Sequence, residues 1–255
     1  QIVFTGSVAT GHSIMQAATE YVVPCVMELG GKSAGVVFAD ADLDQVITSA
    51  EVGNLFNSGQ VCSAMSRLIV HESIYDEVKQ RLVTSFAAKS VGSGKDEADV
   101  TPILTQAQLD KIVAMCAGAK AQGAKCLIGG EALLRTGYFM PPTIIEAAVD
   151  TEIAQQEVFG PVLVLMKFDS EQQAYAMANG TDFGLVAGVF TQNVSLALRA
   201  SRALVAGQVF VNEWFAGGIS PPFGGVGKSG FGREKGQEAL YNYVRTKNIA
   251  IRLTL

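Results

Sequence analysis

The feature that most restricts the possible folds is an alternation of short apolar segments with amphipathic helical segments along the chain. Runs at 33–38, 67–71 and 162–168 are short, apolar and bounded by turn-forming residues, which is typical of buried strands. Helices are expected at residues 8–19, 43–56, 75–88, 106–122, 172–178, 194–203 and 234–240. The alternation predicts an α/β fold with a parallel sheet and crossover connections.

Three segments fit this alternation less simply. Residues 21–27 are expected to form a strand, and Pro24 within it favours an edge or irregular position. Residues 212–232 are rich in glycine and aromatic side chains and predict a long functional loop. Residues 241–255 predict a final strand, whose exposed part at 248–255 would be prone to edge pairing.

Composition excludes several classes of function. The chain has 255 residues, enough for a large core, and a net charge of −5 without any block of lysine or arginine. We therefore expect neither nucleic acid nor an acidic membrane surface as a partner, and no apolar run is long enough to span a membrane. The four cysteines form no CxxC pair and only two histidines are present, so no metal site is predicted. Scattered cysteines favour a reducing compartment, and we expect the cytoplasm.

The first residues have the pattern of a strand already under way. Gln1 is followed by an apolar run at 2–5 and no signal peptide is recognisable. We expect the chain to be the later part of a longer protein.

Cys62 and Glu28 are the residues with the strongest chemical potential. Cys62 lies among small turn-forming residues directly after a helical pattern, which would leave its thiol accessible. Glu28 ends an apolar run one strand and one helix earlier, so chain reversal can bring it to the thiol, where it would activate water. From spacing alone, a buried inert cysteine and a solvated glutamate remain open alternatives.

Gly6 and Ser7 lie between a strand at 2–5 and the helix expected at 8–19. Free backbone N–H groups at such a helix start attract anions, although the GxGxxG fingerprint is absent. This pattern alone is weak evidence for a phosphate site.

Five segments together resemble motifs of the NAD(P)-dependent aldehyde dehydrogenases. They occur in the family's order and are FTGS at 4–7, MELGGKSA at 27–34, LFNSGQVCSAMS at 55–66, EVFGP at 157–161 and PFGGVGKSG at 222–230. The resemblance covers the later part of the family's chain.

The resemblance implies a catalytic centre. Cys62 matches the nucleophile that forms a thiohemiacetal and then a thioester, and Glu28 matches the base that activates water for thioester hydrolysis. Glu234 matches a second glutamate that relays protons with Glu28. The Cys62 backbone N–H would form half of an oxyanion hole, whose other donor in the family is an asparagine that would lie before Gln1.

The resemblance also implies a cofactor, NAD or NADP, and the residues that hold it. Gly6 and Ser7 match the turn at the pyrophosphate, and Glu157 matches the carboxylate on the nicotinamide ribose. The nicotinamide itself would lie near Leu29, Gly30 and Phe159.

The substrate, an aldehyde, would enter past Trp214, Phe215, Ile219 and Phe223. An aromatic lining suits apolar and cationic aldehydes alike. The expected architecture has the end of a Rossmann-like NAD(P)-binding domain at 1–29, a catalytic domain at 30–228, and a return segment with an oligomerisation strand at 229–255. A homodimer or homotetramer is expected.

Two other functions remain open. Cys62 could serve a cysteine hydrolase with His71 as its base, or the chain could be a non-catalytic binding or assembly module. Without the resemblance, Glu157 would be an ordinary loop carboxylate, and Phe159 and Phe223 would be core aromatics. We expect Cys25, Cys116 and Cys126 to be buried and inert, and assign no chemistry to Lys32. The 255-residue chain alone is expected to have little or no activity.

Overall fold

The computed structural model describes residues 1–254 and is built around a seven-stranded sheet. In sheet order its strands are β10 (Gln208–Val211), β9 (Val186–Phe190), β3 (Ser33–Val37), β4 (Met65–His71), β7 (Val162–Phe168), β6 (Thr143–Glu146) and β5 (Lys125–Ile128). All neighbouring pairs are parallel except β5 with β6. The predicted α/β class with a parallel sheet is confirmed.

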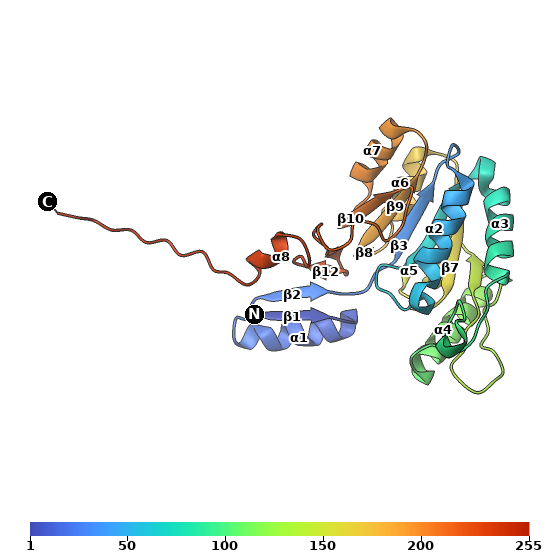
Figure 1. The fold of residues 1–255 in the computed structure, drawn as a ribbon, viewed down its shortest axis with the longest axis horizontal. Coiled ribbons are helices and arrows are strands. Elements are labelled where there is room, and N and C mark those ends of the chain that lie inside the picture. The colour runs from blue at the N-terminus through green and yellow to red at the C-terminus, as the bar shows by residue number, and fades with distance from the viewer. Residues whose placement is uncertain (255) are drawn as a thin grey trace.

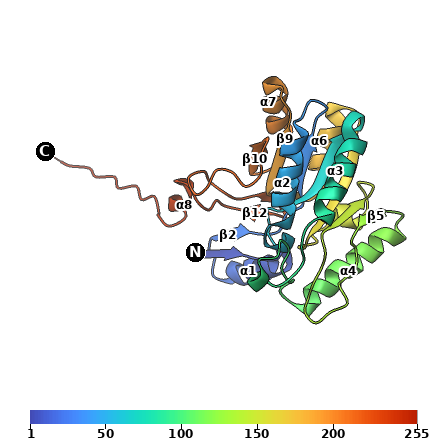
Figure 2. The same ribbon diagram turned by 45° about the vertical axis from the view of Figure 1, so that its right-hand side comes forward.

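Helices cover both faces of this sheet (Figure 1 and Figure 2). One face carries α2 (Leu43–Leu55) and α3 (Tyr75–Ala87). The other face carries α4 (Gln106–Ala121), α5 (Glu152–Gln155), α6 (Glu171–Asn179) and α7 (Val194–Ala203). Successive residues of β3 therefore enter different cores, with Val36 in one and Val37 in the other. Burial on both faces explains why the strand sequences are apolar throughout rather than alternating.

A second, three-stranded sheet lies beside the first. It contains β1 (Ile2–Thr5), β2 (Cys25–Glu28) and β12 (Gly230–Phe231), with β2 in the middle, and α1 (Val8–Glu20) connects β1 to β2. The expectation of an edge strand at 21–27 is wrong, because β2 begins after Pro24 and both of its sides are paired. Since Pro24 precedes the ladder, its missing N–H removes no ladder hydrogen bond.

The expected loop at 212–232 contains two short strands. One is β12, and the other is β11 (Val226–Gly227), which pairs antiparallel with β8 (Phe183–Gly184). Three short 3-10 helices complete the connections, at Phe56–Gly59, Glu72–Ile74 and Gly94–Asp96.

The end of the chain differs most from expectation. Helix α8 covers Glu238–Tyr241 rather than 234–240, because Lys235 and Gly236 both have a φ of 57°, which is incompatible with an α-helix. Residues 244–254 form no ladder within the described chain and extend away from the body (Figure 1). The predicted strand at 241–255 is therefore not formed in a single chain, where it has no partner, and its last residue lies outside the described residues.

None of the described helices is long and apolar enough to span a membrane.

Candidate active site

The loop that carries Cys62 is shaped by three consecutive residues with left-handed backbone. Helix α2 ends at Leu55, and Asn57, Ser58 and Gly59 then have φ angles of 49°, 56° and 71°. Asparagine and glycine tolerate this conformation, whereas serine is less suited to it. The strain indicates that surrounding contacts impose the loop's conformation.

Those contacts fix the loop on both sides of Cys62. Before it, the Ser58 hydroxyl donates to the Thr101 carbonyl at 2.8 Å and accepts from the Thr101 N–H at 2.9 Å. After it, the Trp214 indole N–H donates to the Ser63 carbonyl at 3.1 Å. The cysteine is therefore held at the amino end of β4 by hydrogen bonds to distant parts of the chain.

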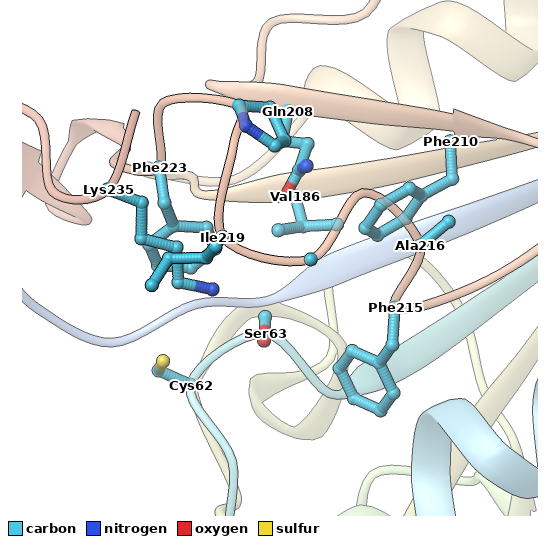
Figure 3. A pocket seen from close by; sticks show the side chains of 12 residues that line it. Cys62, Ser63, Val186, Gln208, Phe210, Phe215, Ala216, Ile219, Phe223 and Lys235 are labelled. Carbon is cyan, nitrogen blue, oxygen red and sulfur yellow. The ribbon is translucent and has the colours of Figure 1, made fainter. Parts of the chain in front are cut away.

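Cys62 is half-buried and borders a cavity of about 580 Å³ (Figure 3). Burial raises the pKa of its thiol, and the negative charges of Glu157 and Glu28 raise that pKa further. Hydrogen bonds from the backbone N–H groups of Ser63 and Cys62 act in the opposite direction. The thiol is thus protonated at rest and needs a base before it can attack.

Glu28, the last residue of β2, is 2% exposed, and neither carboxyl oxygen has a hydrogen-bond partner among the described residues. Burial raises its pKa to about 8; the charge of Glu234 adds to this rise, while Arg233 opposes it. A pKa near neutrality suits a general base. The lack of any protein partner leaves its oxygens available to a water or a substrate.

Glu234 lies within electrostatic reach of Glu28, as the resemblance implied. Its backbone forms two hydrogen bonds of 2.6 Å with that of Phe223, so it is fixed to the loop that borders the Cys62 cavity.

Glu157 lies where the strands β3 and β7 begin. Its Oε1 accepts the Gly31 N–H at 3.0 Å, and a side chain at Gly30 would place its Cβ 2.5 Å from Oε2. Burial raises the pKa of Glu157, whereas the Gly31 N–H, Lys111 and Lys32 oppose that rise. Glycine at position 30 is thus required for the close approach of the carboxylate.

Two of the residues expected to hold a cofactor border a second cavity of about 510 Å³. Ser7 and Glu157 both line it. Ser7 caps α1 by accepting the Thr10 N–H at 3.2 Å, and the Gly6 N–H donates to the Glu28 carbonyl at 3.0 Å. The start of α1 is therefore tied directly to the strand that ends in Glu28.

The three remaining cofactor candidates do not line this cavity. Leu29 and Gly30 are buried, with the Leu29 side chain against Gly11 of α1. Phe159 is half-buried with a φ of 57°, and the Gln108 side chain donates to its carbonyl at 2.9 Å.

The aromatic residues divide into two groups. Phe215, Phe223 and Ile219 line the cavity at Cys62, as Figure 3 shows. Trp214 is 7% exposed, does not line that cavity, and packs in the core. It supports the site from behind through its bond to Ser63 rather than contacting a substrate there.

The arrangement argues against a hydrolase that uses Cys62 and His71. Cys62 precedes β4 and His71 ends it, so the strand's seven residues separate them by roughly 20 Å. His71 instead caps a short helix by accepting the Ser73 N–H.

The other cysteines offer no second nucleophile of comparable setting. Cys116 is buried and its pKa is raised to about 12 by burial, as expected of an inert cysteine, whereas Cys25 and Cys126 are half-buried rather than buried. No group of three or more potential metal ligands occurs among residues 1–254.

Sequence reasoning missed two buried cations behind the site. Lys32 is 1% exposed, its amine has no hydrogen-bond partner within residues 1–254, and burial lowers its pKa to about 7. Arg67 is 2% exposed and donates to the Lys32 carbonyl at 2.9 Å. An arginine within an otherwise apolar strand was the available signal for such a buried role.

Gly31 joins the Glu157 site to the Cys62 loop and provides a first test. A Cβ at this position would lie 2.4 Å from the Cys62 carbonyl oxygen. We expect Gly31→Ala to lower the free energy of unfolding by about 1–3 kcal/mol and to change the rate at which iodoacetamide alkylates Cys62. Denaturant unfolding and peptide mass spectrometry would measure the two effects.

The matched control is Gly118→Ala in α4, where a Cβ would meet nothing within 4 Å. Alanine favours a helix over glycine, so this variant should be stabilised by up to about 1 kcal/mol with unchanged alkylation. Equal behaviour of the two variants would contradict the assigned contact.

Comparison with known proteins adds independent findings. Residues 1–249 match the model of the aldehyde dehydrogenase family. An aldehyde dehydrogenase from Bacillus cereus, solved as an NAD+ complex, is 37% identical, with 100% of this chain and 52% of that chain covered and a TM-score of 0.97. A betaine aldehyde dehydrogenase from Staphylococcus aureus in complex with NAD+ is 36% identical, with 95% and 49% covered and a TM-score of 0.92. The chain thus spans about half the length of these structures.

Proposed function

The chain belongs to the aldehyde dehydrogenase family, and on that basis we propose that the protein oxidises an aldehyde to a carboxylic acid with NAD+ or NADP+. The observation that carries the proposal is that the half-buried Cys62 thiol lies within electrostatic reach of the buried Glu28 carboxyl, which has no hydrogen-bond partner among the described residues. Cys62 borders one cavity of substrate size, and a second cavity lies at the start of α1.

The residues present fit a nicotinamide dinucleotide. The N-terminus of α1, capped by Ser7, would hold the pyrophosphate, and the Glu157 carboxylate in the same cleft would accept hydrogen bonds from ribose hydroxyls. Leu29, Gly30 and Phe159 would border the nicotinamide. When bound, the cofactor supplies the acceptor for the hydride that leaves the substrate carbon.

Cys62 performs the first step. Its thiol gives its proton to the ionised Glu28 carboxylate, and the sulfur adds to the aldehyde carbon to form a thiohemiacetal, whose oxygen gains negative charge. The Cys62 backbone N–H bonds the Cys62 sulfur in the resting site, forms no hydrogen bond to the backbone of another described residue, and would donate to that oxygen. Loss of hydride from the carbon then leaves a thioester on Cys62.

Glu28 performs the second step. Its ionised carboxylate takes a proton from water, the resulting hydroxide adds to the thioester carbon, and the C–S bond breaks to release the carboxylic acid and the Cys62 thiolate, which takes up a proton from solvent. Glu234 would pass the proton onward, since it is the charged neighbour that most raises the pKa of Glu28.

This assignment predicts a pH profile. Because the base must be ionised and its pKa is raised to about 8, kcat should rise with pH up to about pH 8 and level off above it.

In Glu28→Gln the full-length protein should release NADH in one burst and then turn over about 10²- to 10⁴-fold more slowly. Stopped-flow absorbance across pH values would measure both. An unchanged profile in the variant would exclude Glu28 as the base.

Activity is proposed for the complete protein. The 255-residue chain alone is expected to turn over little or no aldehyde, because a second oxyanion donor and most of the cofactor's binding surface would come from the other half of the family's chain. Turnover of the chain alone, compared with a mixture containing the amino-terminal half, tests this. Full activity of the chain alone would contradict it, and a folded whole protein that binds no NAD would favour the binding or assembly module.

We also propose a homodimer or homotetramer in the cytoplasm. The extended segment 244–254 has no ladder partner in its own described chain, and pairing with a neighbouring subunit would satisfy it. Four free cysteines agree with a reducing compartment.

A further inference from the structure

The cavity at Cys62 has an apolar wall interrupted by one charge. Among the described residues that line it, Lys235 is the one lysine, arginine, aspartate or glutamate; the others are mainly aliphatic, aromatic and glycine residues. Figure 3 shows Lys235 and Ile219 on the side of the cavity that Cys62 borders. Lys235 is an exposed residue, so its ammonium can stay hydrated at this wall.

The backbone around Lys235 is held in place by neighbours on both sides. Lys235 itself has a φ of 57°, which is unusual for a lysine. Glu234 pairs with Phe223 through two backbone hydrogen bonds, and the Gly236 N–H donates to the Ile219 carbonyl at 3.1 Å. A strained residue held by its neighbours at a cavity wall is the pattern expected of a functional position.

The Lys235 ammonium lies 5.1 Å from the centre of the Phe223 ring. No carboxylate of residues 1–254 forms an ion pair with it. The face of Phe223 that could have attracted a cationic substrate is thus engaged by the protein's own cation. The positive charge, in turn, remains available to an anion.

A second donor stands in the same wall. Gln208 lines the cavity, and its side-chain amide forms no hydrogen bond with the described residues. An amide N–H and an ammonium on one wall are together suited to the oxygens of a carboxylate.

We propose that Lys235 selects aldehydes that carry an anionic group, such as a carboxylate, at the end remote from the carbonyl. This inference rests on the proposed function and narrows its substrate class. It replaces the sequence-based expectation of apolar or cationic aldehydes, which considered the aromatic residues without the lysine beside them.

The acidic residues near Cys62 do not cancel this preference. Glu28 has a pKa of about 8 and is largely neutral at pH 7. Glu157 accepts the Gly31 N–H and lines the other cavity, on the cofactor side. Glu234 is adjacent to Lys235 in the chain but does not line the cavity, so Lys235 is the charged side chain that an incoming anion meets on the substrate wall.

The test uses Cys62 as its own probe and needs neither cofactor nor turnover. The 255-residue chain is treated with two methanethiosulfonates, one ending in a sulfonate and the other in a trimethylammonium group. The thiolate displaces methanesulfinate and forms a mixed disulfide, and the rate at Cys62 is followed by peptide mass spectrometry. We expect the anionic reagent to react faster relative to the cationic one than it does with a denatured chain.

The rate ratio should follow the charge at position 235. Lys235→Met should lower the anionic-to-cationic ratio by about three- to tenfold, Lys235→Arg should preserve it, and Lys235→Glu should lower it further. Lys125→Met makes the same change in net charge on the distant strand β5 and should leave the ratio unchanged. Circular dichroism would check that each variant is folded.

A ratio in Lys235→Met within twofold of the parent chain would overturn the proposal, as would a Cys62 that neither reagent reaches. A parallel assay separates this failure from that of the proposed function. If the full-length protein oxidises butanal but has no higher kcat/KM for 4-oxobutanoate, aldehyde oxidation stands and the anionic preference falls. If neither aldehyde is oxidised, the proposed function itself fails.

Discussion

Replacing Cys62 by serine in the full-length protein is expected to lower kcat/KM for aldehyde oxidation by about 10³-fold or more. A serine hydroxyl is a far weaker nucleophile than a thiol, and its ionisation in this half-buried setting would be more costly still. Burial and the charges of Glu157 and Glu28 already raise the pKa of the thiol, so the site has little capacity to ionise a hydroxyl. NADH absorbance with a saturating aldehyde would measure the loss.

The control is Cys126→Ser, which makes the same atomic change at a half-buried cysteine on β5, far along the sheet from β4. It should retain kcat/KM within about twofold, because the Cys126 thiol bonds only to the Ile128 and Gly129 carbonyl groups of its own turn and its side chain packs against the core away from both cavities. NAD+ affinity should be unchanged in both variants, since neither sulfur holds the cofactor. A Cys62→Ser protein with ordinary turnover would refute thiohemiacetal chemistry at this residue.

The sequence was sufficient to predict the sheet because burial on both faces makes its strands short and apolar. The strand expected at 162–168 occurs with those bounds, and those expected at 33–38 and 67–71 occur at 33–37 and 65–71. The predicted bounds were wrong where the backbone conformation of a few residues interrupts a helical sequence pattern. Residues 234–240 have a helical composition, but left-handed backbone at Lys235 and Gly236 delays the helix to Glu238.

For the candidate site, local sequence drew attention to Cys62 and Glu28 but left inert alternatives open for both. The resemblance to aldehyde dehydrogenase motifs gave them their expected roles, and neither source gave the arrangement. That Glu157 meets the Gly31 N–H depends on chain segments far apart in sequence, which spacing alone does not specify. Trp214 was assigned to the substrate wall because aromatic residues often line pockets, whereas its indole N–H is used to hold Ser63.

Lys235 illustrates the opposite difficulty. In the sequence it is one lysine in a polar segment, and in the structure it is an exposed residue that also borders a cavity. Only the bridge between Phe223 and Glu234 turns it toward a cavity whose other residues lie far away in the chain. Charge on a substrate wall is therefore a tertiary property that composition and motifs do not reveal.

The buried arginine provides the second large effect that we expect. Arg67 lies on β4, is 2% exposed and donates to three carbonyl groups, those of Lys32, Met177 and Ala178, at 2.9, 2.8 and 2.7 Å. Two of these belong to the last turn of α6, where a cation is favoured by the helix dipole. Burial lowers the pKa of Arg67 to about 10, so it remains charged at neutral pH.

Arg67→Leu should therefore lower the free energy of unfolding by about 3–5 kcal/mol, because it leaves buried carbonyl groups without donors. Arg199→Leu is the matched control. Arg199 of α7 forms an ion pair near the surface with Glu171 of α6, so this substitution should lower the free energy of unfolding by no more than about 1 kcal/mol. Urea unfolding of the 255-residue chain would measure both. Equal losses of unfolding free energy in the two variants would show that the three hydrogen bonds from Arg67 to carbonyl groups do not account for its effect on stability. A much larger loss for Arg67→Leu would support the role of Arg67 in joining α6 to the start of β3. Lys32, whose carbonyl accepts from Arg67, directly follows the glycine whose N–H donates to Glu157.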